Sequence, residues 1–86
     1  MNVKKELIKR EIAGDVILVP VGKTALDNNG LFILNEVGGF LWDRLEQAEN
    51  KDDLVNAVLA EYEVDEATAV QDVDYFLDKL IKMEIL

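Results

Sequence analysis

The fold is decided by residues 31–45, whose sequence is LFILNEVGGFLWDRL. Residues 31–34 form a short apolar run, which favours a buried strand. Asn35 is a good N-cap for a helix, and Glu36 follows in the first turn, where the helix dipole favours an acid. Apolar residues then recur at three- and four-residue spacing, at Val37, Leu41, Leu45 and Ala48. This stretch therefore predicts a strand that passes directly into a helix.

Two adjacent glycines, Gly38 and Gly39, lie inside this predicted helix. Each costs roughly 1 kcal/mol of helix stability relative to alanine. Some feature of the folded protein must offset that cost. We expect the helix to approach the strand just before it so closely that no side chain fits at these two positions.

The residues before this stretch predict a β-hairpin. Residues 6–13 mix apolar and charged side chains, and residues 16–19 form a β-branched run. Gly14 and Asp15 form the expected turn between them, and Pro20 should end the second strand because it cannot donate to a ladder. With residues 31–34, this gives three antiparallel strands, about the minimum for a stable sheet.

The residues after this stretch predict two further helices. Asn50 caps the first, whose apolar stripe runs from Leu54 to Tyr62, and Asp65 caps the second, whose stripe runs from Ala69 to Met83. Residues 1–86 are too few for more than one domain. The predicted fold is α+β, a three-stranded antiparallel sheet followed by three helices.

The last predicted helix has an unusually wide apolar face. Its apolar residues span an arc of roughly 160°, where a surface helix needs about 100° or more. One shoulder of the arc carries Phe76 and Met83, with Asp72 and Lys79 just beyond it. This shoulder is either ordinary core covered by the strands or one wall of a groove beside the sheet edge. Methionine is common on adaptable binding surfaces, which slightly favours the groove.

The composition excludes most catalytic machinery. The 86 residues include no Cys, no His and no Ser. Thiol and serine nucleophiles, imidazole acid–base catalysis, Cys/His zinc sites and disulfides are therefore ruled out. We predict no catalytic residues and no cofactor, and the lack of disulfides is compatible with a reducing cytoplasm. No apolar run approaches the length of a membrane span.

The charge is negative and unevenly distributed. The chain carries nine basic and eighteen acidic residues, a net charge of −9. Residues 1–34 hold five basic and four acidic side chains, whereas residues 35–86 hold four basic and fourteen acidic ones. Phosphate backbones and anionic lipids would be repelled by the second part, so we expect neither nucleic acid nor membrane as a partner. The acidity either keeps the protein in solution or steers a basic partner.

Two groups of polar residues are candidates for a metal site, and a third segment resembles part of a calcium loop. Asp74 and Asp78 lie one helical turn apart, as do Asp52 and Asn56, but no His accompanies them and a solvated face explains them. Residues 27–30 resemble the start of a calcium loop, but the glycine arrives two residues early. We predict no metal site.

Four segments of the chain form a recognisable series. They are residues 19–22 (VPVG), 34–42 (LNEVGGFLW), 54–64 (LVNAVLAEYEV) and 72–80 (DVDYFLDKL). The most specific parts are an LNE-x-G…W segment and a DV-x-x-FL segment. Together these segments resemble the PqqD-like family, the peptide-recognition domains (RiPP recognition elements) of pathways that modify ribosomally made peptides. The resemblance extends from about Gly14 to Leu86.

The resemblance implies a winged-helix-like fold that binds the leader segment of a precursor peptide as a strand added to the third strand. The implied groove lies between that strand and the third helix, and main-chain hydrogen bonds would supply part of the affinity. The implied partners are the leader peptide and a maturation enzyme, such as a radical SAM enzyme or a leader protease. The implied peptide-binding residues are Leu31, Phe32, Ile33, Leu34, Asp72, Phe76, Lys79 and Met83.

Two other functions were weighed against leader-peptide binding. A winged-helix transcription factor would suit the fold but not the acidic helices. An acidic regulatory or structural subunit with the same fold and no leader peptide is the main alternative. The sequence leaves open the class of peptide, the partner enzyme, the leader sequence and the oligomeric state.

Overall fold

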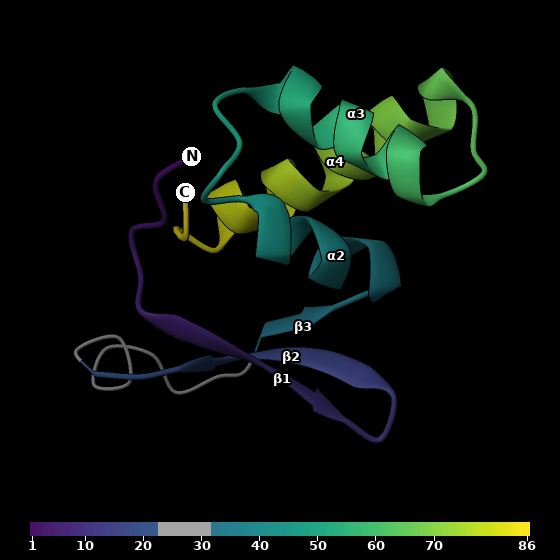
Figure 1. Ribbon diagram of the computed structural model, residues 1–86. Coiled ribbons are helices and arrows are strands. Elements are labelled where there is room, and N and C mark those ends of the chain that lie inside the picture. The colour runs from purple at the N-terminus through teal and green to yellow at the C-terminus, as the bar shows by residue number, and fades with distance from the viewer. Residues whose placement is uncertain (23–31) are drawn as a thin grey trace.

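The computed structural model of the protein describes residues 1–22 and 32–86. A three-stranded antiparallel sheet is followed by three helices, so the predicted α+β fold is confirmed (Figure 1). The strands are β1 (Leu7–Ile12), β2 (Asp15–Pro20) and β3 (Phe32–Leu34). The helices are α2 (Glu36–Arg44), α3 (Lys51–Glu61) and α4 (Glu66–Lys82). Residues 27–30, whose sequence does not match a calcium loop, and Leu31 lie outside the described residues.

The hairpin of β1 and β2 turns one residue earlier than predicted. Ile12 pairs with Asp15, so the two turn residues are Ala13 and Gly14, with φ angles of 52° and 87°. Positive φ at both positions characterises the two-residue turn that matches the twist of a hairpin. Asp15, predicted as a turn residue, is instead the first residue of β2.

The sheet has the order β1-β2-β3, with β2 in the centre. All three helices lie on one side of it, and α2 is the helix nearest the strands (Figure 1). Leu18 of β2 pairs with Phe32, and Val16 pairs with Leu34. Leu18 and Leu34 are buried under the helices. Ile33 points to the opposite side of the sheet and is 56% exposed.

The two glycines of α2 allow close contact with the sheet. A Cβ atom at Gly38 would lie 3.3 Å from the Leu34 Cβ, as expected for an approach to the preceding strand. At Gly39 it would lie 3.0 Å from both methyl carbons of Val16, which belongs to β2. Both are closer than ordinary van der Waals contact between carbons. The helix thus approaches two strands, of which the sequence indicated one.

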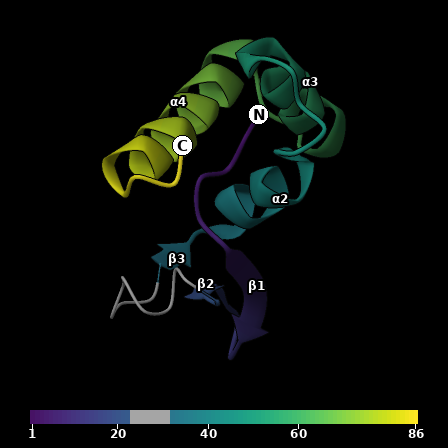
Figure 2. The same ribbon diagram turned by 90° about the vertical axis from the view of Figure 1, so that its left-hand side faces the viewer.

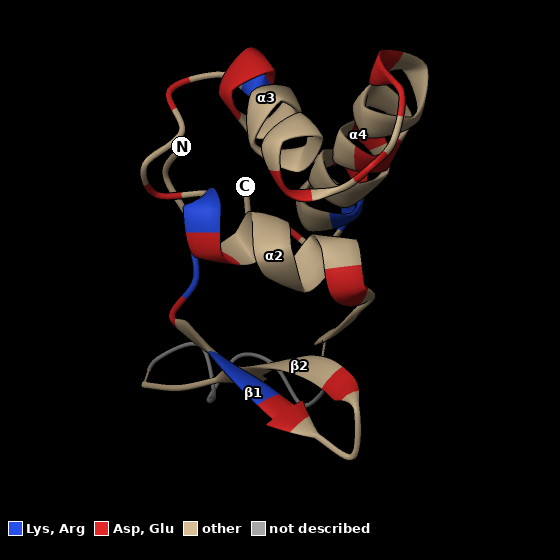
Figure 3. Cartoon of the chain, turned by 45° about the vertical axis from the view of Figure 1, so that its right-hand side comes forward, with Lys and Arg blue, Asp and Glu red and all other residues tan. Residues whose placement is uncertain are grey.

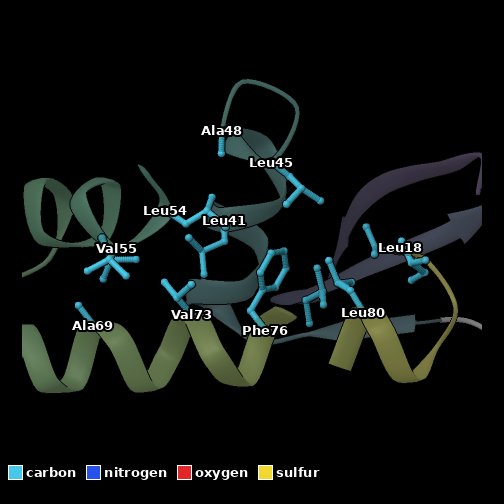
Figure 4. Packing of buried hydrophobic residues seen from close by; sticks show 13 residues of the cluster. Leu18, Leu41, Leu45, Ala48, Leu54, Val55, Ala69, Val73, Phe76 and Leu80 are labelled. Atoms are coloured by element: carbon cyan, nitrogen blue, oxygen red, sulfur yellow. The ribbon is translucent and has the colours of Figure 1, made fainter. Parts of the chain in front are cut away.

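One core joins the sheet to the helices (Figure 4). Leu18, Leu41 and Leu80 meet in it from β2, α2 and α4, and all three are fully buried. The C-terminal segment adds the fully buried Ile85, which the helical pattern did not single out. The backbone N–H of Lys4 donates to the Ile85 carbonyl at 2.7 Å, so the segment after α4 runs beside the N-terminal segment.

None of the described helices is long and apolar enough to cross a membrane.

Candidate functional site

The candidate site begins with the free edge of β3. One edge of β3 pairs with β2, and no other described strand pairs with it. Along an antiparallel strand the backbone groups of successive residues point alternately to the two edges. The Ile33 carbonyl accepts a hydrogen bond from a side chain of α4, so this residue points its N–H and C=O away from β2. Ile33 therefore offers a donor and an acceptor in the position that a fourth strand would use.

Helix α4 forms the other wall of the site. Its N-cap is Asp65, whose side chain accepts a hydrogen bond from the Thr68 N–H at 2.7 Å. Hydrogen bonding from the Thr68 side chain, and then from its backbone N–H, lowers the pKa of the Asp65 carboxyl. The buried face of the helix consists of Ala69, Val73, Phe76 and Leu80. That face fixes the helix against the core and sets its C-terminal half above β3 (Figure 2).

A single side chain joins the two walls. Lys79 Nζ donates a hydrogen bond to the Ile33 carbonyl oxygen at 2.7 Å, across 46 positions of sequence. The same ammonium lies 6.0 Å from the centre of the Tyr75 ring. The edge of β3 is thus in direct contact with α4, and Lys79 lies over the acceptor of its central residue.

A small cavity lies beside this contact, with a volume of about 10 Å³. That volume holds about one water molecule. Its walls come from the end of β3, the start of α2 and the C-terminal half of α4. The lining residues are Leu34, Asn35, Gly38, Tyr75, Phe76 and Lys79. This cavity by itself is therefore too small to hold a peptide side chain.

The structure brings together some of the sequence-predicted site residues. Leu34, Phe76 and Lys79 line the same cavity, and Lys79 bonds to Ile33. Phe76 is almost wholly buried, at 2% exposed, so it contributes to the core and presents only an edge to the cavity. Phe32 is partly buried against the core, and the Lys5 ammonium lies 5.7 Å from its ring centre.

The remaining predicted site residues lie apart from the cavity. Asp72 lies within α4 and Met83 is its C-cap, and both are partly buried residues that do not line the cavity. Met83 packs against the core, and its backbone carbonyl accepts a hydrogen bond from Lys5 Nζ at 2.8 Å. Leu31 lies outside the described residues. No observation tests whether any of these residues binds a peptide.

Sequence reasoning missed Tyr75 as a wall of the cavity. Counted at 100° per residue, Tyr75 lies about 100° beyond Phe76 and outside the apolar arc. The ring is 60% exposed, in agreement with that position. Only the packing of α4 beside β3 brings it to the cavity. Asn35 was identified as a helix cap, and its side chain does accept from the Gly38 N–H at 2.7 Å.

Of the two groups considered as metal ligands, Asp74 and Asp78 are ion-paired to lysines. Asp74 accepts from Lys51 at 2.5 Å, and Asp78 pairs with Lys82 at 3.0 Å on the same helix. Among residues 1–22 and 32–86, no three His, Cys, Asp or Glu side chains are grouped as a metal would require. Red, acidic positions recur along α3 and α4, and β1 carries both blue, basic and red, acidic positions (Figure 3).

The comparisons with known proteins agree with this geometry. The family model "Coenzyme PQQ synthesis protein D (PqqD)" matches residues 15–86. A similar solved structure is TbiB1 in complex with the TbiA(beta) leader peptide, at 29% sequence identity and a TM-score of 0.73. The alignment covers 100% of this chain and 94% of TbiB1. No curated protein matches the chain. With a family match over most of its length, a sheet edge beside α4 and the same fold as TbiB1, the chain belongs to the PqqD family.

Proposed function

We propose that this chain binds the leader segment of a ribosomally synthesised precursor peptide. The peptide adds to β3 as a fourth strand, and the chain presents it to a separate enzyme. Residues 1–86 act in this role as a single domain. Because ribosomal peptides are made in the cytoplasm, we place the protein there as well.

The observation that carries the proposal is the outward-facing backbone of Ile33. Its N–H and C=O lie on the edge of β3 that faces no described strand. Addition of a peptide strand to an exposed sheet edge is a common mode of recognition, in which pockets for alternate side chains give specificity. TbiB1, which shares the fold at 29% identity, was solved with a leader peptide, and this supports the same ligand class here.

The free-energy contributions to peptide binding differ between backbone hydrogen bonds and side-chain contacts. Two new hydrogen bonds at Ile33 supply about 1–3 kcal/mol, at ~0.5–1.5 kcal/mol each. Ordering a disordered peptide costs about 2–5 kcal/mol, which can cancel that gain. Burying on the order of 300 Å² of apolar peptide surface contributes about 7 kcal/mol. Affinity therefore depends mainly on apolar contacts with α4, and the backbone bonds fix the register.

We assign the chemistry on the peptide to a partner enzyme, such as a radical SAM enzyme or a leader protease. The polar side chains that line the cavity are Asn35, Tyr75 and Lys79. Asn35 caps α2 and Lys79 holds the edge of β3, so both have structural partners. In this proposal the protein is a non-catalytic carrier of the peptide.

The test uses synthetic peptides that correspond to the N-terminal halves of the short open reading frames flanking the gene. Binding is measured by fluorescence anisotropy on the wild-type chain, Ile33→Pro and Ile33→Val. Proline removes the outward N–H and is tolerated on an edge strand, whereas valine keeps the N–H and most of the side chain. We expect at least a 10-fold loss for Ile33→Pro, and less than a 3-fold loss for Ile33→Val, if the lost bond and its register are worth about 1.4 kcal/mol or more.

Asp52→Ala serves as the distant control, because Asp52 is exposed in the first turn of α3. Its binding should equal that of the wild-type chain. If no flanking peptide binds, the proposal is wrong and the acidic regulatory or structural subunit becomes the better account. Equal losses from Ile33→Pro and Asp52→Ala would contradict strand addition at β3.

A further inference from the structure

Lys79 occupies the acceptor that an added strand needs. Its ammonium donates to the Ile33 carbonyl at 2.7 Å, on the free edge of β3. A peptide strand that pairs with Ile33 must donate its own N–H to the same oxygen. A carbonyl oxygen has two lone pairs, so the incoming N–H competes with the ammonium for this acceptor, and the flexible four-carbon stem of the lysine lets it move aside.

The charge of Lys79 has only a weak partner in this state. Lys9, Lys51 and Lys82 pair with the carboxylates of Asp43, Asp74 and Asp78. Lys79 contacts a neutral carbonyl and the face of the Tyr75 ring, and it makes no ion pair within the part of the chain that the structure describes. The bond to the carbonyl is already assisted by the charge of the ammonium, but a carboxylate would add the attraction between two opposite unit charges. A carboxylate beside the edge of β3 would thus be a better partner for Lys79 than the carbonyl.

The sheet geometry tells where in the peptide such a carboxylate would lie. Directly paired residues place their side chains on the same face of a sheet. Ile33 points away from the helices, so the residue paired with it does too. The two neighbours of that residue point toward α4 and Lys79, because side chains alternate along a strand.

We propose that Lys79 is a latch on the Ile33 carbonyl, and that an acidic side chain in the peptide opens it by taking over the ammonium. The acid lies directly before or after the residue that pairs with Ile33. This inference rests on the proposed function, since it names the chemistry by which the same edge selects its peptides. Lys79 is then a specificity-determining residue as well as a wall of the groove.

The test selects ligands from a display library of short random peptides on the immobilised full chain. Enriched peptides that lose binding to Ile33→Pro are kept, because these add to β3. We expect Asp or Glu at one fixed position among them. Each such peptide is then resynthesised with Gln in place of Glu, or Asn in place of Asp, and both forms are titrated against the wild-type chain and Lys79→Met.

We expect the preference for the acidic peptide over its amide form to depend on Lys79. On the wild-type chain the acidic peptide binds about 10-fold more tightly than its amide form, the effect of one charged pair worth ~1.4 kcal/mol. On Lys79→Met, which keeps the length of the stem, the two forms bind alike. The amide form binds Lys79→Met more tightly than it binds the wild-type chain, because no latch has to be displaced. Lys79→Arg restores the preference for acid.

Lys82→Met is the matched control, since Lys82 lies on the same helix and pairs with Asp78. The Lys82→Met variant should keep the wild-type preference for the acidic form of the peptide. Lys79→Gln replaces Lys79→Met if the methionine variant does not fold. Peptides that need the Ile33 N–H but show no acid preference would overturn the latch and leave the proposed function intact. If none of the selected peptides needs that N–H, the latch and strand addition fall together.

Discussion

At the scale of single residues, Gly39 shows how one missing side chain sets the distance between α2 and the sheet. A Cβ atom there would lie 3.0 Å from both methyl groups of Val16. Valine has a single strongly preferred rotamer in most settings, so its methyl groups cannot easily turn away. The packing of α2 on β2 therefore requires glycine even though glycine weakens the helix.

Gly39→Ala should destabilise the protein by about 1 kcal/mol in urea unfolding. Overpacking typically costs about 1–3 kcal/mol, and the better helix propensity of alanine returns about 1 kcal/mol. In a Val16→Ala background the clash is gone, so the same substitution should stabilise by about 0.5–1 kcal/mol. The sign should thus change between the two backgrounds. Additive effects of the two substitutions would contradict the close approach described above.

Two side chains of the site show where sequence reasoning succeeded and where it could not. Lys79 was placed on the shoulder of the last helix from the helical wheel alone, and it does reach the edge of β3. Tyr75 lies outside the apolar arc, and only the placement of α4 beside β3 brings its ring to the cavity. A wheel describes one helix, and it contains no information on which neighbour each flank will meet.

At the scale of elements, the caps were easier to predict than the turn. Asn35, Asn50 and Asp65 each cap a helix with the side-chain bond that the sequence suggested. Capping is local, because the acceptor and the N–H lie three residues apart. The hairpin turn was predicted one residue late, because Gly14 and Asp15 are favoured turn residues and the observed turn contains Ala13 at a positive φ. Strand register, which involves two segments at once, decided that position.

The cap of α4 also gives the protein a dependence on pH. Hydrogen bonds from the Thr68 side chain and from the Thr68 N–H hold the pKa of the Asp65 carboxyl below its ordinary value of 3.8. A carboxyl with a lower pKa in the folded state stabilises the fold fully above its unfolded-state pKa. That contribution is lost as the pH falls through the folded-state value.

Asp65→Asn should therefore melt at a lower temperature than the wild-type chain at neutral pH. The asparagine still accepts a hydrogen bond, but it lacks the charge that favours the start of α4. As the pH falls through the folded-state pKa of the Asp65 carboxyl, the two melting temperatures should converge, because the wild-type carboxyl loses its charge. Glu11→Gln, at an exposed position of β1, is the control and should show no such convergence. A difference that stays constant over this range would contradict the assigned role of the Asp65 charge.

At the scale of the whole molecule, the helices cover one face of the sheet and leave one strand edge beside α4. Helix α2 connects directly to β3 and packs over β2, while α4 stands with its C-terminal half above β3 (Figure 2). The segment after α4 runs beside the N-terminal segment, with Lys4 bonded to Ile85. The C-terminal segment therefore does not take the place of a fourth strand, and the side chain of Lys79 is what meets the edge instead.

The alternating pattern and the helix periods were sufficient to predict this architecture, because each element has its own local signal. The contact between Lys79 and Ile33 spans 46 residues and depends on how α4 is oriented across α2 and the core. The position of α4 relative to β3 follows from the packing of its residues Phe76 and Leu80 in the core. The periodicity of the sequence therefore could not predict the contact between Lys79 and Ile33.

The central claim is that the outward backbone of Ile33 accepts a peptide strand, and amide hydrogen exchange at that residue tests it most directly. Exchange is followed by NMR on the labelled chain, free and saturated with a bound leader peptide. The account predicts that the Ile33 N–H exchanges rapidly in the free protein and is strongly protected in the complex. The N–H groups of Phe32 and Leu34, which face β2, should be protected in both states. If the Ile33 amide exchanges equally fast with and without saturating peptide, the strand does not add at β3 and the account is contradicted.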